Sequence, residues 1–247
     1  MNNIKTGTLY GVGVGPGDPE LLTLKAHRLI QAAAVIAYPA AEGVPSFARQ
    51  IVASYLNEDQ REILMEMPMV AARFPAQDVY DKGAKEISEA LEAGLDVVVL
   101  CEGDPFFYGS FMYLFARLED RYKTEIVPGV SSLMTCAAVA RMPLVARNDR
   151  FTVLTGPMSD DEILAGLADS QAIAIMKVGR HLPRLVGLVK QAGLLDVAVY
   201  VERASLENQR VMPLADLAEA TAPYFSMILI HRRGMAWSPS DVKKVTG

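Results

Sequence analysis

Short apolar runs alternate with longer amphipathic segments along the whole chain. Alternation of this kind predicts an α/β fold, in which helices join the strands of a sheet. In the first half, we expect strands at Leu9–Val14, Val35–Tyr38, Asp96–Cys101 and Glu125–Val127. The helices between them are expected at Pro19–Ala33, Pro45–Tyr55, Ala76–Ala93, Phe111–Asp120 and Ser132–Ala140. Gly94 is the expected C-cap of the helix that ends at Ala93.

The pattern breaks at residues 141–150, which are polar, contain Pro143 and show little periodicity. It then restarts, with strands expected at Phe151–Leu154, Ala172–Val178, Val197–Glu202 and Met227–His231. Further helices are expected at Asp160–Ala168, Leu182–Ala192 and Leu214–Ala220. We therefore predict two α/β domains in tandem, residues 1–146 and 147–247. Open α/β sheets bind ligands at the carboxyl ends of their strands, so we expect an active-site cleft between the two domains.

Composition narrows the class of partner. The chain has 247 residues, a formal net charge of −5 and a pI of about 5.3, which argues against nucleic acid or an anionic membrane as the main partner. No apolar run reaches the roughly 18 residues that a membrane span needs. The three histidines lie far apart and give no metal-ligand spacing, so no bound metal is expected.

The cysteines and the N-terminus suggest a compartment. Cys101 and Cys136 are the only cysteines, and both lie in apolar contexts typical of reduced, buried thiols. Asn2, Asn3 and Lys5 are polar and do not form the apolar core of a secretory signal. We expect a cytoplasmic protein.

Glycines occupy alternate positions from Gly11 to Gly17, directly after the strand-like run Leu9-Tyr10, and Asp18 is placed to cap the helix that follows. A dinucleotide-binding turn would need an acidic residue about 20 positions further on, but residues 21–41 contain none. A phosphate-binding P-loop would need Gly-Lys-Ser/Thr, whereas Gly17 is followed by Asp18. A ligand loop of another kind and a tight turn without a ligand both remain open.

Two more loops follow strands. Residues 102–109 (EGDPFFYG) place Gly103 and Asp104 beside three aromatic residues, so Asp104 has either a ligand to bind or an Asp-Pro turn to stabilise. Residues 127–132 (VPGVSS) place Ser131 and Ser132 at a helix start, where their hydroxyls either bind a polar ligand or cap the helix.

These three loops, read in order as residues 11–26, 102–109 and 127–132, resemble the signature loops of the tetrapyrrole methylases. Members of that family are S-adenosylmethionine-dependent enzymes of cobalamin and sirohaem biosynthesis. Residues 35–40, 176–184, 199–205 and 223–233 resemble the members that methylate C-20 of precorrin-2 or its cobalt form. The chain departs from the pattern at Cys101-Glu102, where relatives often carry a Thr-Leu or similar pair; this adds a carboxylate of undefined role.

The resemblance implies two α/β domains, usually in a homodimer, with S-adenosylmethionine in the cleft. The cofactor contacts that it implies are Pro16, Gly103, Asp104, Phe107, Ser131, Ser132, Met176 and Ala204. The tetrapyrrole contacts are Gly15, Asp18, Arg180 and His181, and the catalytic candidates are Asp104 and Tyr108. The basic residues that either bind the substrate carboxylates or lie as solvated surface charges are Arg147, Arg150, Lys177, Arg180, His181 and Arg203.

The implied reaction is methyl transfer from the sulfonium to C-20 of precorrin-2 or cobalt-factor II, in vitamin B12 (cobalamin) biosynthesis. After the transfer C-20 must lose its proton, and the groups considered as base are Asp104, Glu102, Tyr108 and His181. The alternatives are transfer to C-11 or C-17, transfer to uroporphyrinogen III, and a carrier without activity. The sequence leaves the metal-free and the cobalt-loaded substrate equally open.

Overall fold

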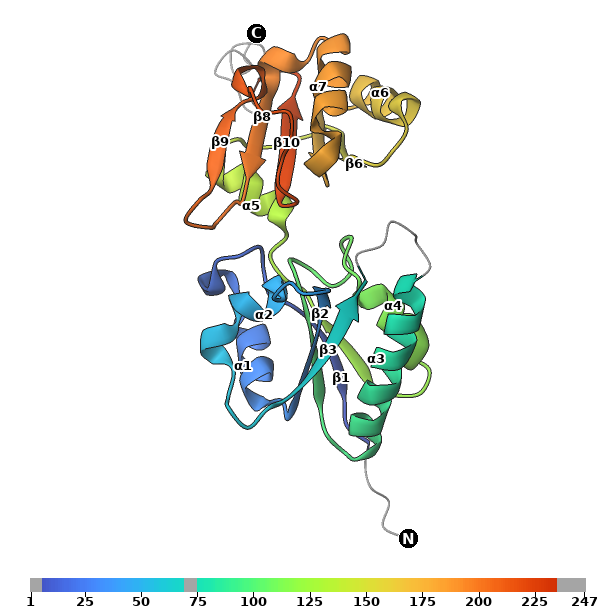
Figure 1. Cartoon of the computed structure of the whole chain (residues 1–247). Coiled ribbons are helices and arrows are strands. Elements are labelled where there is room, and N and C mark those ends of the chain that lie inside the picture. The colour runs from blue at the N-terminus through green and yellow to red at the C-terminus, as the bar shows by residue number, and fades with distance from the viewer. Residues whose placement is uncertain (1–5, 69–74, 235–247) are drawn as a thin grey trace. The chain divides into compact units, whose positions relative to one another are not determined.

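The computed structural model describes residues 6–68 and 75–234 and forms two compact units that divide between Ser131 and Ser132 (Figure 1). The break that the sequence predicts near residue 146 lies inside the second unit. Helix α5 (Ser132–Val139), expected in the first domain, groups with the second unit, where it contacts strand β10 (Ser226–His231).

The first unit is built on a parallel sheet of five strands in the order β3-β2-β4-β1-β5. Its strands are β1 (Leu9–Gly13), β2 (Val35–Ala41), β3 (Arg61–Met67), β4 (Val97–Cys101) and β5 (Thr124–Val127). Its helices are α1 (Leu24–Ala32), α2 (Phe47–Ile51), α3 (Pro75–Glu92) and α4 (Phe111–Leu118). Helices α1 and α2 cover one face of this sheet, and α3 and α4 cover the other (Figure 1).

The central strand β4 explains why this sheet is covered on both faces. Val97 and Val99 pack into the core under α3 and α4, while Val98 and Leu100 pack into the core under α1 and α2. Successive side chains of a strand point to opposite faces, so an uninterrupted apolar run needs a helical layer on each side.

The helix predicted over Pro19–Ala33 is wrong as one continuous element. Asp18 caps only a turn of 3-10 helix, with its Oδ1 accepting a hydrogen bond of 2.8 Å from the N–H of Glu20. Thr23 then caps α1, its Oγ1 accepting from the N–H of Ala26 at 3.1 Å. Two caps in succession start two separate elements. The C-cap at Gly94 is confirmed, with a φ of 83° and its N–H donating to the carbonyl of Leu91.

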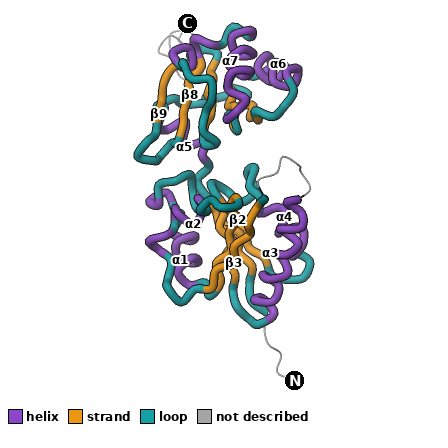
Figure 2. The backbone as a smooth tube through the Cα atoms, in the orientation of Figure 1, coloured by secondary structure: helices purple, strands orange, loops and turns teal. Residues whose placement is uncertain are grey.

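The second unit has a mixed sheet in the order β6-β7-β10-β8-β9. Figure 2 shows β8 and β9 side by side in this sheet. Its other strands are β6 (Phe151–Thr155), β7 (Ala172–Met176), β8 (Ala198–Glu202) and β9 (Arg210–Pro213), and its other helices are α6 (Asp160–Asp169) and α7 (Leu182–Gln191). Strand β6 runs parallel to β7, β10 runs antiparallel to β7 and β8, and β9 runs antiparallel to β8. One edge therefore gathers the carboxyl ends of β6, β7 and β8 and the amino ends of β9 and β10.

Two strands and a further helix also differ from the sequence prediction. Strands β3 and β9 were not expected, and both lie at sheet edges. Strand β3 exposes Arg61, Glu62 and Glu66, and β9 has only 4 residues, so neither has the apolar run of a central strand. The helix expected at Leu214–Ala220 is wrong, because only one 3-10 turn forms, at Leu214–Asp216. None of the helices within residues 6–68 and 75–234 is long and apolar enough to cross a membrane.

Candidate active site

Three loops meet through their main chains at the carboxyl edge of the first sheet. The N–H of Gly103, after β4, donates to the carbonyl of Gly15, after β1, at 2.8 Å, and the N–H of Gly15 returns a longer bond of 3.3 Å. A Cβ on Gly129, after β5, would lie 2.0 Å from the carbonyl oxygen of Gly103. A Cβ on Gly13 would lie 2.6 Å from the Cα of Gly129. The glycines are therefore needed for the loops to touch one another.

Asp104 holds two of these loops together. Its Oδ1 accepts hydrogen bonds from the N–H groups of Phe106 at 2.9 Å and Phe107 at 3.1 Å. Its Oδ2 accepts from the N–H of Gly129 at 3.1 Å. Both carboxylate oxygens are thus engaged by main chain, an arrangement that fixes the loops after β4 and β5. The expected cofactor and catalytic roles of Asp104 stay predictions.

The other residues predicted in the first unit lie in the same loops. Gly15 has a φ of 79°, and Pro16 and Gly103 are buried. Phe107 is half-buried, whereas Tyr108 is exposed and has a left-handed φ of 56°. A residue with a side chain rarely adopts such a backbone, and residues that do are concentrated at functional sites.

Ser131 follows β5, and Ser132 begins α5. Both serines are half-buried, as is Asp18, whose Oδ1 is the cap described above. The structure therefore brings the predicted residues of the first unit to one sheet edge, and Ser132 is the first residue of the second unit. The ligand roles of all these residues stay predictions.

Glu102 is the carboxylate of this edge that the structure leaves available. Within residues 6–68 and 75–234 its side chain makes no hydrogen bond or ion pair, and the residue is exposed. Desolvation by the surrounding atoms nevertheless raises the pKa of Glu102 above that of a free glutamate. Burial also raises the pKa of its neighbour Cys101, to which the charges of Asp104 and Glu102 add.

The carboxyl edge of the second sheet gathers the remaining predicted residues. Met176 ends β7, and Ala204 is buried just after β8. Arg180 is exposed and His181 half-buried in the 3-10 turn Gly179–His181 that follows β7. Burial, and then the charges of Arg180 and Arg184, lower the pKa of His181, which keeps the imidazole neutral at neutral pH.

Left-handed backbone recurs at this edge. Lys177, Arg203 and Ser205 have φ values of 56°, 50° and 68°. Each such residue costs on the order of 1 to 3 kcal/mol and persists only where its surroundings hold it. For Arg203 the main-chain N–H donates to the carbonyl of Phe225 at 2.8 Å, which fixes the loop after β8 against the segment before β10.

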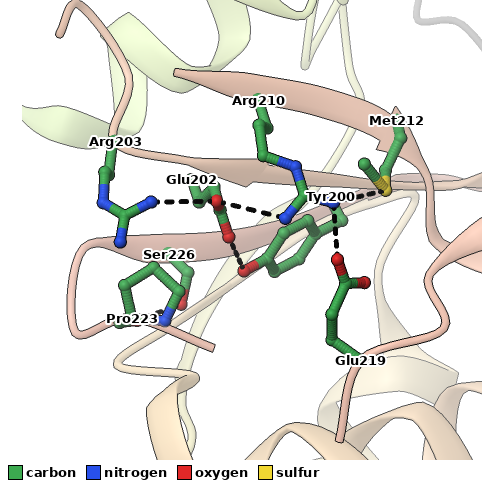
Figure 3. Close-up of polar contacts among 8 residues, drawn as sticks. All are labelled: Tyr200, Glu202, Arg203, Arg210, Met212, Glu219, Pro223 and Ser226. Carbon is green, nitrogen blue, oxygen red and sulfur yellow. Dashed lines mark hydrogen bonds and ion pairs between the residues drawn. The ribbon is translucent and has the colours of Figure 1, made fainter. Parts of the chain in front are cut away.

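Glu202 is buried at the end of β8 and lies at the centre of a polar cluster (Figure 3). Its Oε1 pairs with Arg203 at 3.2 Å and with Arg210 at 3.4 Å, and its Oε2 accepts a hydrogen bond of 2.6 Å from the hydroxyl of Tyr200. Burial, together with the carboxylate of Glu202, raises the pKa of Tyr200. Arg210 also pairs with Glu219 at 2.7 Å.

Sequence reasoning missed the role of Glu202. The available signal was a charged residue at the end of an otherwise apolar strand, immediately before an arginine. Of the other basic residues considered, Arg150 pairs with Asp169 at 3.1 Å on the surface. The described residues contain no group of three or more His, Cys, Asp or Glu that could hold a metal ion.

Comparison with known proteins now adds to this geometry. The family model of Tetrapyrrole (Corrin/Porphyrin) Methylases matches residues 8–220, a range that includes all three glycine loops and the loop after β8. The chain belongs to the tetrapyrrole methylases. This confirms the family resemblance that the three loops indicated.

Two relatives within the family match the chain over nearly its whole length. A precorrin-2 C(20)-methyltransferase of Sinorhizobium sp is 41% identical over 238 residues, which cover 93% of this chain and 97% of that protein. A cobalt-precorrin-2 C(20)-methyltransferase of Salmonella typhimurium is 31% identical over 232 residues, which cover 92% of this chain and 97% of that protein.

A solved tetrapyrrole methylase has the same fold. The uroporphyrin-III C-methyl transferase of Thermus thermophilus, complexed with S-adenosyl homocysteine, superposes with a TM-score of 0.67 at 23% identity and covers 91% of this chain and 92% of that one. The α/β fold with two sheets predicted from the sequence is confirmed.

Proposed function

We propose that the chain transfers a methyl group from S-adenosylmethionine to C-20 of precorrin-2 or of its cobalt form, in cobalamin biosynthesis. The observation that carries this proposal is the 41% identity, over nearly the full length, to a protein named for that reaction. The stretches that resemble C-20 methyltransferases support the same conclusion; they lie in β2, at the end of β7, and across β8 and β10.

The described residues fit the cofactor. Glycine-rich loops pack closely at the carboxyl edge of the first sheet, Ser131 and Ser132 add hydroxyls, and Phe107 offers a half-buried apolar ring. Ala204 is small and buried at the edge of the second sheet. S-adenosylmethionine, when bound, supplies an electrophilic methyl group on a sulfonium.

Positioning is the main contribution that we assign to the first unit. A methyl transfer between two bound molecules gains most from alignment of the reacting atoms and from exclusion of water. The Gly15–Gly103 bridge and the three main-chain bonds of Asp104 make the three loops one rigid body that can supply this alignment.

Glu102 is the group that we propose as acceptor of the C-20 proton. When the new carbon–carbon bond has formed, the carbon–hydrogen bond at C-20 breaks, its electron pair returns to the macrocycle and the proton passes to an acceptor. Both oxygens of Asp104 already accept main-chain hydrogen bonds, whereas the carboxylate of Glu102 has no partner within the described residues. Its raised pKa makes the carboxylate of Glu102 a stronger base than an ordinary glutamate.

We also infer a cytoplasmic homodimer. Two buried, reduced cysteines fit a reducing compartment. Phe106, Met112 and Tyr113 are each at least 40% exposed in or next to α4, and such apolar surface is typical of a subunit contact.

Turnover tests the proposed function. We expect anaerobic incubation with precorrin-2, or with cobalt-factor II, to release S-adenosylhomocysteine and to raise the mass of the macrocycle by one methyl group. Transfer only to uroporphyrinogen III would keep the family and overturn the substrate.

A further inference from the structure

We propose that Arg203 binds a carboxylate group at the edge of the second sheet, and that Glu202 positions Arg203 for this contact. The ligand class is a carboxylate, and two molecules of the proposed reaction carry one: the macrocycle, on its acetate and propionate arms, and the methionine part of the cofactor. The inference rests on the proposed function for the identity of these ligands.

The Glu202 carboxylate is a fixed anchor for the guanidinium group of Arg203. Its side chain is 5% exposed, and a charge buried to this degree is costly unless it is paired and hydrogen-bonded. Arg203, Arg210 and the hydroxyl of Tyr200 supply those partners (Figure 3). The anchor sits in the last residue of β8, so it is fixed by the sheet.

Arg203 uses only part of its guanidinium in this anchor. Its Nη1 donates to Oε1 of Glu202 at 3.2 Å, and its side chain makes no other hydrogen bond or ion pair within residues 6–68 and 75–234. The Nε–Nη2 edge is therefore open, and the side chain is 37% exposed. The same edge of Arg49 binds the carboxylate of Glu62 at 2.7 and 2.8 Å, which shows the geometry that an incoming carboxylate would adopt.

Arg210 pairs with the same oxygen of Glu202, but its remaining guanidinium nitrogens are not left open in the same way. Its Nη1 reaches Glu202 and its Nη2 reaches Glu219 at 2.7 Å, so its charge is balanced by two carboxylates. Its side chain is 41% exposed, close to the value for Arg203. Arg210 is thus a matched control for the charge, exposure and network of Arg203.

The backbone places Arg203 next to a residue that the sequence predicts to contact the cofactor. Arg203 is held in a left-handed conformation by the hydrogen bond from its N–H to Phe225, and the next residue is Ala204, a predicted cofactor contact. A strained backbone fixed by a cross-strand bond is typical of a binding residue whose direction matters.

Binding measured without turnover tests the proposal. We would titrate Arg203→Met with S-adenosylhomocysteine and, separately, with cobalt-factor II. Loss of a charge-assisted hydrogen bond predicts that the dissociation constant of one of the two ligands rises about 10-fold to 100-fold. A loss for S-adenosylhomocysteine identifies the methionine carboxylate, and a loss for cobalt-factor II identifies an arm of the macrocycle.

Control variants decide between binding and folding. We expect Arg210→Met to change both dissociation constants by less than about 2-fold, and Arg203→Lys to fall between Met and the natural residue. Unchanged binding of both ligands by Arg203→Met, or an equal loss in Arg210→Met, would overturn the proposal. Absence of methyl transfer would overturn the proposed function and leave these binding results as they stand.

The positioning role of Glu202 has a test of its own. Glu202→Gln should weaken the same ligand as Arg203→Met, and the double variant should bind it no more weakly than Arg203→Met alone. Additive losses in the double variant would contradict this role.

Discussion

At the scale of single residues, the two acidic side chains of the loop after β4 have opposite surroundings. Both carboxylate oxygens of Asp104 accept hydrogen bonds from main-chain N–H groups, whereas neither oxygen of Glu102 accepts one from the described residues. The sequence placed both carboxylates in one loop but could not separate their roles, because the partners of Asp104 include Gly129, which lies 25 positions away. The partners of Glu202, in contrast, lie within eight positions of it, and its sequence signal was a charged residue at the end of an apolar strand.

Asp104→Asn should damage the loops. The new amide group would face the N–H of Gly129, so a donor would meet a donor, and one buried hydrogen bond would be lost. We expect a loss of about 1 to 3 kcal/mol in the free energy of unfolding and weaker binding of S-adenosylhomocysteine. Urea denaturation and calorimetric titration measure the two effects; an unchanged unfolding curve would count against the linking role.

Glu102→Gln should act on the rate and leave stability alone. A base works only when deprotonated, so kcat should rise with pH through the raised pKa of Glu102 in the natural protein. In Glu102→Gln this rise should vanish and kcat should fall about 100-fold or more, with the same thermal unfolding. A pH–rate profile in which the rise survives would exclude Glu102 as the acceptor.

At the scale of elements, the central strands and the edge strands β5 and β6 were predictable, whereas the edge strands β3 and β9 were not. The central strands are largely buried in the sheets, so their residues form apolar runs that can be recognised in the sequence; they are β1, β2, β4, β7, β8 and β10. Edge strands β3 and β9 depend on pairing with a neighbour, which no local pattern encodes. The three glycine loops were predictable as loops, but their mutual contact follows from the strand order β4-β1-β5.

Gly129→Ala should separate the loops after β4 and β5. The added Cβ would lie 2.0 Å from the carbonyl oxygen of Gly103, a main-chain atom that cannot move without breaking the Gly15–Gly103 bridge. We expect loss of cofactor binding and a lower melting temperature. Gly187→Ala is the matched control, because this helical glycine of α7 has open space around its Cβ position. The control should stabilise the protein by about 0.5 to 1 kcal/mol, and equal effects of the two variants would refute the packing argument.

At the scale of the whole molecule, each compact unit carries one buried cysteine. Cys101 lies in β4 of the first unit and Cys136 in α5 of the second. Burial raises the pKa of both thiols, that of Cys136 to about 12, so neither forms the reactive thiolate at neutral pH.

Alkylation should therefore report the unfolding of each unit separately. We expect iodoacetamide to leave both cysteines unmodified in buffer and to label each as its own unit unfolds in urea, with peptide mass spectrometry resolving the two transitions. Fast labelling of either thiol in buffer would contradict its burial.

The position of the transferred methyl group tests the central claim most directly. Precorrin-2 and cobalt-factor II, each incubated anaerobically with the protein and with S-adenosylmethionine carrying a ¹³C methyl group, would be examined by NMR. We predict one labelled methyl group on C-20 of at least one substrate, and a preference between the two would assign the metal-free or the cobalt branch. Label on another carbon, or no label on either substrate while the cofactor is bound, would contradict the account.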